Sequence, residues 1–242
     1  PRCLMTLDQR LARLRAEGFL RIVVLPFTRA LAMLGAEAFV ARVLVRRLRI
    51  AHVVVGYDFH FGRGGHGDAA LLTALGSRLG FGVTVVPPVL LKGEPVSSTR
   101  IRKLLAVGDL GEAARQLGRP FALAGRRVAG RRLGRAIGFP TINLVPRNEM
   151  LPRNGVYAVR LPALRLGGVA NLGLRPTVEW TTVAPRLEVH AFGRVPSRLP
   201  ARLDVEFIRF LRPELKFASV ELLRRRIVRD AALARRVLSS RY

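Results

Sequence analysis

A ten-residue segment that opens on glycine and arginine ends in two side chains suited to a metal ion. It reads Gly-Arg-Ala-Ile-Gly-Phe-Pro-Thr-Ile-Asn over residues 134–143. Glycines let backbone N–H groups approach a polyphosphate closely, and arginines supply forked, charged donors to phosphate oxygens. Thr141 and Asn143 carry the hard oxygens that Mg²⁺ accepts alongside phosphates, and both point the same way if this end is extended. The segment therefore predicts a site for a metal-bound polyphosphate.

The same composition is also typical of a flexible basic loop, and the residues of this segment alone leave both interpretations open. Two known phosphate motifs are excluded. The segment is not a Walker A loop, because no Gly-Lys-Ser/Thr follows. It is not a dinucleotide fingerprint, because no acidic residue stands at the required distance after a strand–helix turn.

Two other stretches could hold a nucleotide or a flat ligand. The loop Gly56–Gly62 contains Asp58 and follows a predicted strand, at the sheet edge where open α/β sheets bind ligands. Ser98 and Thr99 place hydroxyls at a predicted helix start with Arg102 one turn on, an arrangement that favours phosphate. The alternatives without a binding role are an ordinary loop for the first stretch and a simple helix cap for the second.

A candidate general base lies on the alternating stretch Leu187–His190. If Leu187 and Val189 face the core, Glu188 and His190 face the other side of the strand. A carboxylate there could take a proton from a substrate hydroxyl within hydrogen-bond reach. The alternative is a solvated strand glutamate with no chemical role.

The first half of the chain alternates helical and extended patterns. Apolar periodicity and glycine or proline stops predict these elements, which together favour a parallel α/β sheet with helical crossovers. The predicted helices are 7–18, 36–48, 69–79, 97–106 and 110–117, and the predicted strands are 20–25, 50–55 and 82–86.

After Pro120 short strands with turn signals take over, and their spacing predicts an antiparallel barrel. A long amphipathic helix over 219–238 is expected to pack on that barrel. The change of pattern predicts two domains, residues 1–119 and 120–242. The predicted barrel strands are 121–130, 154–161, 168–172, 187–192 and 202–210.

The composition of the chain indicates which binding partners and which cellular compartment to expect. The net charge of +26 would suit nucleic acid, but only three of the 42 basic residues are lysine and the arginines are spread along the chain. We therefore expect no specific nucleic-acid partner, although a basic nucleic-acid binder stays an alternative. No apolar run reaches the ~18–20 residues that a membrane helix needs, so no membrane partner is expected. Cys3 is the only cysteine, which predicts a reducing, cytoplasmic location.

Taken in order, these motifs resemble the bacterial bifunctional riboflavin kinase/FMN adenylyltransferase (FAD synthetase) family over nearly the whole chain. Each motif is weak alone, and the ordered set is specific. The stretches that carry the resemblance are Gly56–Gly62, Ser97–Arg102, Leu117–Pro120, Gly134–Asn143, Gly155–Ala158, Asn171–Thr177, Glu188–His190 and Arg212–Phe217.

The resemblance implies a riboflavin kinase barrel preceded by a nucleotidyltransferase-like, Rossmann-like α/β domain. In the kinase half, Thr141 and Asn143 would hold Mg²⁺ and ATP phosphates, and Glu188 would be the base for attack by the terminal ribityl hydroxyl of riboflavin. This agrees with phosphoryl transfer in general, which needs positioning, a metal and a carboxylate that orients the nucleophile. The stretch that would cover the nucleotide includes Gly130, Gly134, Arg135, Gly138 and Pro140.

In the other half, Ser98, Thr99 and Arg102 would bind ATP phosphates and the Asp58 loop would help to hold FMN. The substrates implied are riboflavin, FMN and ATP, and the products are FMN and FAD. The family's His-x-Gly-His phosphate motif and its first strand–helix unit are not found among the 242 residues, so we expect weak or absent FMN adenylylation. A non-catalytic paralogue that binds flavin or nucleotide is the alternative.

Overall fold

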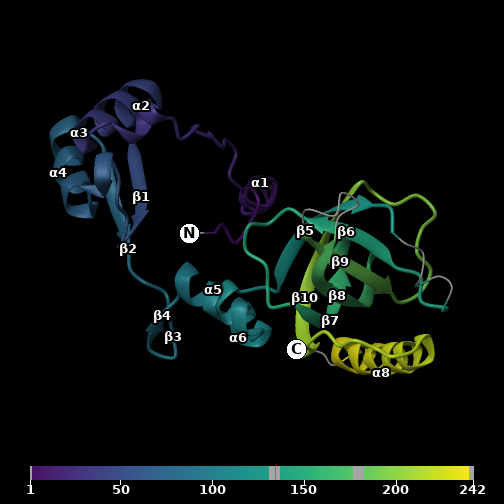
Figure 1. Cartoon of the computed structure of the whole chain (residues 1–242). Helices are drawn as coiled ribbons and strands as arrows, with labels where there is room; N and C mark the ends of the chain where they lie inside the picture. The colour runs from purple at the N-terminus through teal and green to yellow at the C-terminus, as the bar shows by residue number, and fades with distance from the viewer. Residues whose placement is uncertain (1, 131–133, 135–136, 177–182, 240–242) are drawn as a thin grey trace. The chain divides into compact units, whose positions relative to one another are not determined.

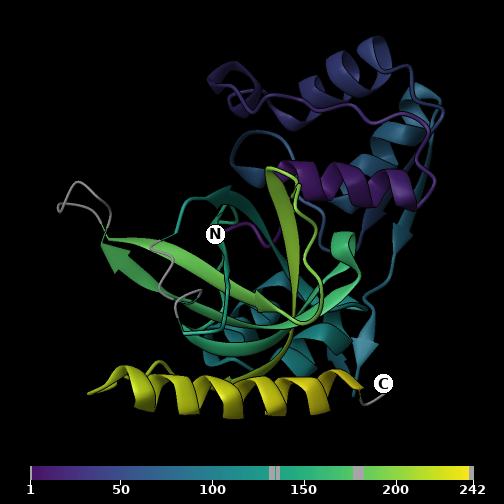
Figure 2. The same ribbon diagram turned by 90° about the vertical axis from the view of Figure 1, so that its right-hand side faces the viewer.

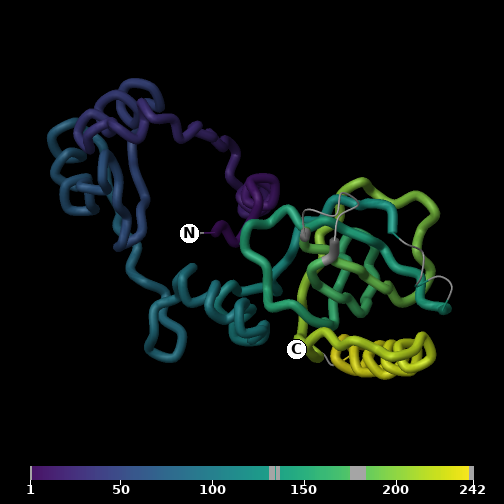
Figure 3. The backbone as a smooth tube through the Cα atoms, viewed as in Figure 1, coloured from purple at the N-terminus to yellow at the C-terminus, as the bar shows by residue number. Residues whose placement is uncertain are grey.

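The computed structural model describes residues 2–130, 134, 137–176 and 183–239 (Figure 1). The chain divides into two units, one of Pro1–Leu20 with Ser97–Tyr242 and one of Arg21–Val96. The backbone trace in Figure 3 shows that the chain leaves the first unit after the N-terminal helix and returns to it before residue 100. Each unit is described by itself.

The unit of residues 21–96 is built on two parallel strands, β1 (His52–Gly56) and β2 (Gly82–Val86). Helix α4 (Ala69–Leu79) connects them, and α3 (Ala36–Phe39) continues as a π-helix over Val40–Arg47. The helices and the sheet enclose one core, which confirms the predicted parallel α/β pattern. The unit also contains α2 (Arg29–Ala32), a 3₁₀ turn (Arg63–Gly65) and the hairpin β3 (Leu90–Leu91) and β4 (Glu94–Pro95).

The predicted strand over residues 20–25 is wrong. These residues form no strand, and the side chains of Leu20, Val23 and Val24 are exposed. A strand must pair its backbone with a neighbour, and among the described residues β1 and β2 pair only with each other. An apolar run of this length therefore lacks the partner that would make it a strand.

The second unit holds a closed six-stranded antiparallel barrel in the order β10-β5-β6-β9-β8-β7. The predicted barrel and its five predicted strands are confirmed. Strand β6 was not among the predicted strands; it is short, begins two residues after Pro140 and ends at Pro146. The strands are β5 (Phe121–Val128), β6 (Ile142–Pro146), β7 (Gly155–Leu161), β8 (Leu166–Pro176), β9 (Val183–Ala191) and β10 (Arg202–Arg212), with a 3₁₀ turn (Pro162–Leu164) between β7 and β8.

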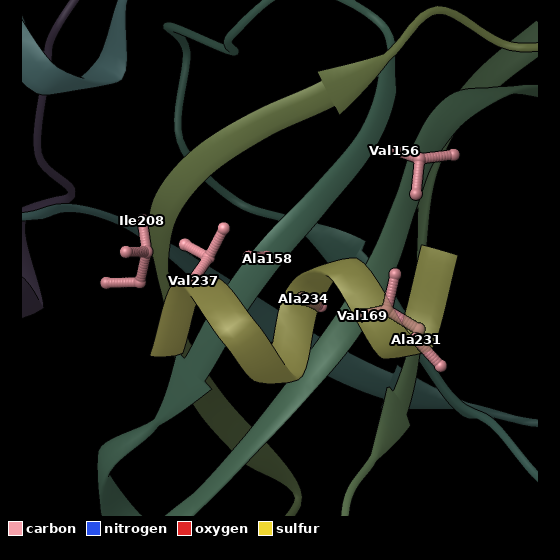
Figure 4. Close-up of a cluster of buried hydrophobic side chains, with 7 residues drawn as sticks. All are labelled: Val156, Ala158, Val169, Ile208, Ala231, Ala234 and Val237. Atoms are coloured by element: carbon pink, nitrogen blue, oxygen red, sulfur yellow. The ribbon is translucent and has the colours of Figure 1, made fainter. Parts of the chain in front are cut away.

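The long helix α8 (Val220–Ser239) lies along the outside of the barrel (Figure 2). Figure 4 shows its Ala231, Ala234 and Val237 against valine, alanine and isoleucine side chains of β7, β8 and β10. Strand β7 is buried on both faces as a result, since its alternate residues fill the barrel. No helix within the described ranges is long and apolar enough to cross a membrane.

The end of β10 is tied to α8 by a buried ion pair. Arg212 holds Asp230 in a forked contact, with Nη2–Oδ2 at 2.7 Å and Nε–Oδ2 at 2.9 Å. The two side chains are only 10% and 5% exposed, and Arg226 adds a second contact to Asp230 at 3.2 Å. This geometry gives each of the two buried charges a hydrogen-bonded partner in a region that water does not reach.

The N-terminal helix and two middle helices belong to the barrel unit. Helix α1 (Leu7–Ala16) starts with a capping box between Thr6 and Gln9, and Gln9 also reaches Asp204 Oδ1 at 3.3 Å. The amide of Asn148 donates to the carbonyl of Leu4 at 3.1 Å. Helices α5 (Ser98–Val107) and α6 (Leu110–Leu117) complete this unit. The N-terminal residues, which are far from the barrel strands in sequence, therefore build part of the same unit.

Two carboxyl groups on β10 are expected to make stability fall as pH rises. Burial raises the pKa of Asp204 and of Glu206, with smaller opposing effects from a Gln9 hydrogen bond and from the Arg160 charge respectively. The folded chain therefore binds these protons more tightly than the unfolded chain. The resulting contribution to stability is present at low pH, and it is lost as pH rises from the ordinary carboxyl pKa through the raised pKa of the folded chain. We expect an Asp204→Asn, Glu206→Gln double variant to gain thermal stability over the wild type as pH rises from about 4 to 7.

The control is Glu221→Gln, because Glu221 makes an exposed ion pair with Arg225 on α8. Thermal unfolding midpoints of the three proteins across the same pH range provide the measurement. Parallel curves for the wild type and the double variant would contradict the prediction.

Candidate active site

Three polar side chains form a row across neighbouring strands of the barrel. In the strand registers Asn143 of β6 lies opposite Glu188 of β9, and Glu188 lies opposite Asn171 of β8. Their chain neighbours Leu187 and Leu172 are fully buried, as the predicted alternation around Glu188 requires. The row therefore lies on the outer face of the barrel, where directly opposed side chains contact one another.

The spacing of Thr141 and Asn143 fits two neighbouring ligands of one metal ion. Asn143 Nδ2 lies 3.3 Å from Thr141 Oγ1. Rotating the amide by 180° puts Oδ1 in that place, and adjacent oxygens around an octahedral Mg²⁺ are separated by about 3 Å. Among the described residues no group of three or more His, Cys, Asp or Glu side chains could hold a metal. With only these two protein oxygens, the other coordination positions of the ion would be left to phosphates and water.

Glycines of the predicted phosphate segment allow close approaches of the backbone near Thr141 and Asn143. A Cβ on Gly130 would lie 2.3 Å from Asn143 Nδ2, and one on Gly134 would lie 2.4 Å from the carbonyl oxygen of Phe139. Gly138 has φ of +86°, which favours glycine. Three glycines are thus needed for the local path of the chain. Arg135 lies outside the described residues.

His190 contacts the two residues just before Thr141, which its position in the sequence did not predict. Its Nδ1 is 3.0 Å from the carbonyl oxygen of Pro140, and its ring meets Phe139 edge-on with centroids 5.2 Å apart. A carbonyl oxygen only accepts, so Nδ1 carries the donated proton. The alternation of β9 placed His190 on the same face as Glu188, but nothing in the sequence revealed its partner 50 residues away.

Two family models match separate parts of the chain. A family model described as Riboflavin kinase matches residues 117–238, and one described as FAD synthetase matches residues 1–100. A bifunctional riboflavin kinase/FMN adenylyltransferase of Pseudomonas fluorescens is 41% identical over 233 residues, which cover 96% of this chain and 75% of that protein. The chain belongs to the bifunctional riboflavin kinase/FMN adenylyltransferase family.

Other members of the bifunctional riboflavin kinase/FMN adenylyltransferase family match over similar lengths. The Escherichia coli K12 protein is 39% identical, with 97% of this chain and 75% of that protein covered, and the Haemophilus influenzae protein is 36% identical, with 99% and 78% covered. A crystal structure described as a macrolide-efflux protein from Streptococcus pneumoniae superposes with a TM-score of 0.82 at 29% identity, over 96% of this chain and 75% of that one. The chain is therefore an ATP-dependent transferase of flavin metabolism with the family's fold.

The predicted residues of the adenylyltransferase half fall in both units. Asp58 is exposed in the loop after β1, where its carbonyl oxygen lies 2.9 Å from His60 Nδ1. Phe61 of the same loop is buried and stacks on Phe59, so its ring packs in the core and is not available to a flat ligand.

Ser98, Thr99 and Arg102 lie on the first turns of α5, in the other unit. The helix cap is supplied by Ser97, whose hydroxyl accepts from the backbone N–H of Arg100. Arg102 Nε donates to the carbonyl oxygen of Arg2 at 2.7 Å. The structure thus gives the capping role to the residue before Ser98 and leaves Ser98 and Thr99 exposed.

Proposed function

We propose that this chain transfers the γ-phosphoryl group of ATP to the terminal ribityl hydroxyl of riboflavin at the row of Asn143, Glu188 and Asn171. The observation that supports the proposal is the strand register that pairs Glu188 of β9 with Asn143 of β6. Attack by an alcohol on ATP requires a base next to a side chain that helps to hold the phosphates.

In the proposed reaction the hydroxyl oxygen of riboflavin forms a bond to the γ-phosphorus as the bond to the β,γ-bridging oxygen breaks. Glu188 accepts the hydroxyl proton, and the products are FMN and ADP. Thr141 and Asn143 would hold Mg²⁺, which supplies neutralising charge to the phosphates when it is bound. The segment of Gly130, Gly134, Arg135, Gly138 and Pro140 would cover the nucleotide, with its backbone path fixed by the glycines.

The second reaction of the family would convert FMN and ATP to FAD and diphosphate. We assign its phosphate contacts to Ser98, Thr99 and Arg102, and its flavin contact to the Asp58 loop. We further propose a domain boundary near residue 119, a cytoplasmic location, which suits a chain with Cys3 as its single cysteine, and no specific nucleic-acid or membrane partner.

Incubation of the purified chain with riboflavin, ATP and Mg²⁺, followed by chromatographic separation of the flavins, tests the proposal. FMN is expected to form only when ATP and Mg²⁺ are both present, and FAD is quantified in the same separation. Riboflavin that binds tightly and is recovered unconverted would contradict the kinase proposal and favour a non-catalytic flavin-binding protein.

A further inference from the structure

The third member of the row, Asn171, is held from outside the sheet by a carboxylate. Its Nδ2 donates to Glu214 Oε1 at 2.9 Å, and Glu214 comes from the segment just after β10. A carboxylate oxygen accepts and does not donate when ionised, so this contact fixes which end of the Asn171 amide faces Glu214. The oxygen end, Oδ1, must therefore face elsewhere.

That oxygen is a buried acceptor with no hydrogen-bond partner among the described residues. Buried polar atoms in folded proteins nearly always have a partner, so an acceptor without one needs a donor from another source. Asn171 lies directly opposite Glu188, the proposed base. The missing donor is thus expected close to where the reacting hydroxyl must lie.

Gly173 makes the contact between Asn171 and Glu214 possible. It lies two residues along β8 from Asn171, on the same face of the strand. A Cβ built on Gly173 would lie 2.3 Å from Glu214 Oε1 and 2.6 Å from both its Cδ and its Oε2, and these are the three heavy atoms nearest to it. The bare backbone at Gly173 therefore leaves the space that the carboxylate occupies.

We propose that Asn171 Oδ1 accepts a hydrogen bond from a hydroxyl of the ribityl chain of riboflavin, and that Glu214 is a positioning residue that fixes the amide for this purpose. The inference rests on the proposed riboflavin kinase function and adds a contact that selects flavins with a polyol chain. Riboflavin carries such hydroxyls, whereas lumiflavin has the same ring system with only a methyl group in place of the chain.

The test compares the affinities of riboflavin and lumiflavin, measured by fluorescence titration in the absence of ATP. The wild type is expected to prefer riboflavin, and Asn171→Ala to reduce that preference about tenfold, the effect of one lost hydrogen bond near a buried group. Gly173→Ala is expected to do the same by displacing the Glu214 carboxylate, although it removes no polar group. Glu214→Gln keeps an acceptor oxygen for Asn171 and should retain the preference, whereas Glu214→Leu should lose it.

Gly111→Ala is the matched control, because a Cβ there meets only ordinary contact with Asp109 at 3.8 Å. Circular dichroism establishes that each variant is folded. An unchanged preference in folded Asn171→Ala or Gly173→Ala would overturn the inference. Failure of the wild type to convert riboflavin to FMN would instead overturn the proposed function, so the two failures are distinguishable.

Discussion

Glu188→Gln is expected to slow riboflavin phosphorylation by about 10²–10⁴-fold, the usual contribution of a general base. The amide keeps the shape of the carboxylate and its place between Asn143 and Asn171, but it cannot take the hydroxyl proton. The apparent affinity for riboflavin should change little, so the loss should appear in kcat. Initial rates of FMN formation at saturating MgATP provide the measurement.

Glu206→Gln is the matched control, since Glu206 is a partly buried carboxyl on β10 of the same barrel and lies outside the row. Its rate of FMN formation is expected to match the wild type. If Glu188→Gln or Glu188→Ala phosphorylates riboflavin as fast as the wild type, Glu188 is not the base.

The largest effect on stability is expected from Asp230→Ala, which should lower the free energy of unfolding by about 3–5 kcal/mol. The substitution leaves the Arg212 guanidinium buried with its carboxylate partner gone, although Arg212 Nη1 still reaches the carbonyl oxygen of Pro213. Urea unfolding followed by circular dichroism measures the change.

The control on the same helix is Glu221→Ala, which breaks an ion pair with Arg225 whose side chains are 56% and 70% exposed. Exposed pairs contribute at most about 1 kcal/mol, so this variant should stay close to the wild type. Replacing Arg212 and Asp230 together by methionine and leucine should recover most of the loss, because both buried charges of the pair are then gone. Equal losses for Asp230→Ala and Glu221→Ala would contradict the prediction.

Local signals in the sequence were sufficient for much of the fold. Helix α4 was predicted with its observed bounds, because Asp68 caps its start and Gly80 ends it in a left-handed conformation. Five of the six barrel strands were predicted from alternation and turn residues. The prediction of a strand over residues 20–25 was wrong because apolar composition does not provide a pairing partner.

Only those parts of the site that depend on the alternation of side chains along one strand could be predicted. Alternation placed Glu188 and His190 on one face and paired Thr141 with Asn143. The register that aligns Asn143, Glu188 and Asn171 joins β6 to the consecutive strands β8 and β9, and β7 separates β6 from them in the chain, so no local signal encodes the whole row. The Asn171–Glu214 contact spans 43 residues and was missed for the same reason.

The position of β10 in the barrel has a consequence for how the chain acquires its activity. The last strand to be synthesised pairs with β5 on one side and β7 on the other, so the barrel stays open until residue 212 has emerged. Until then two strand edges lack partners, a state that invites wrong pairing and that long-range topology makes slow to resolve. Glu214 follows β10 directly, so we expect the preference for riboflavin over lumiflavin to depend on closure of the barrel.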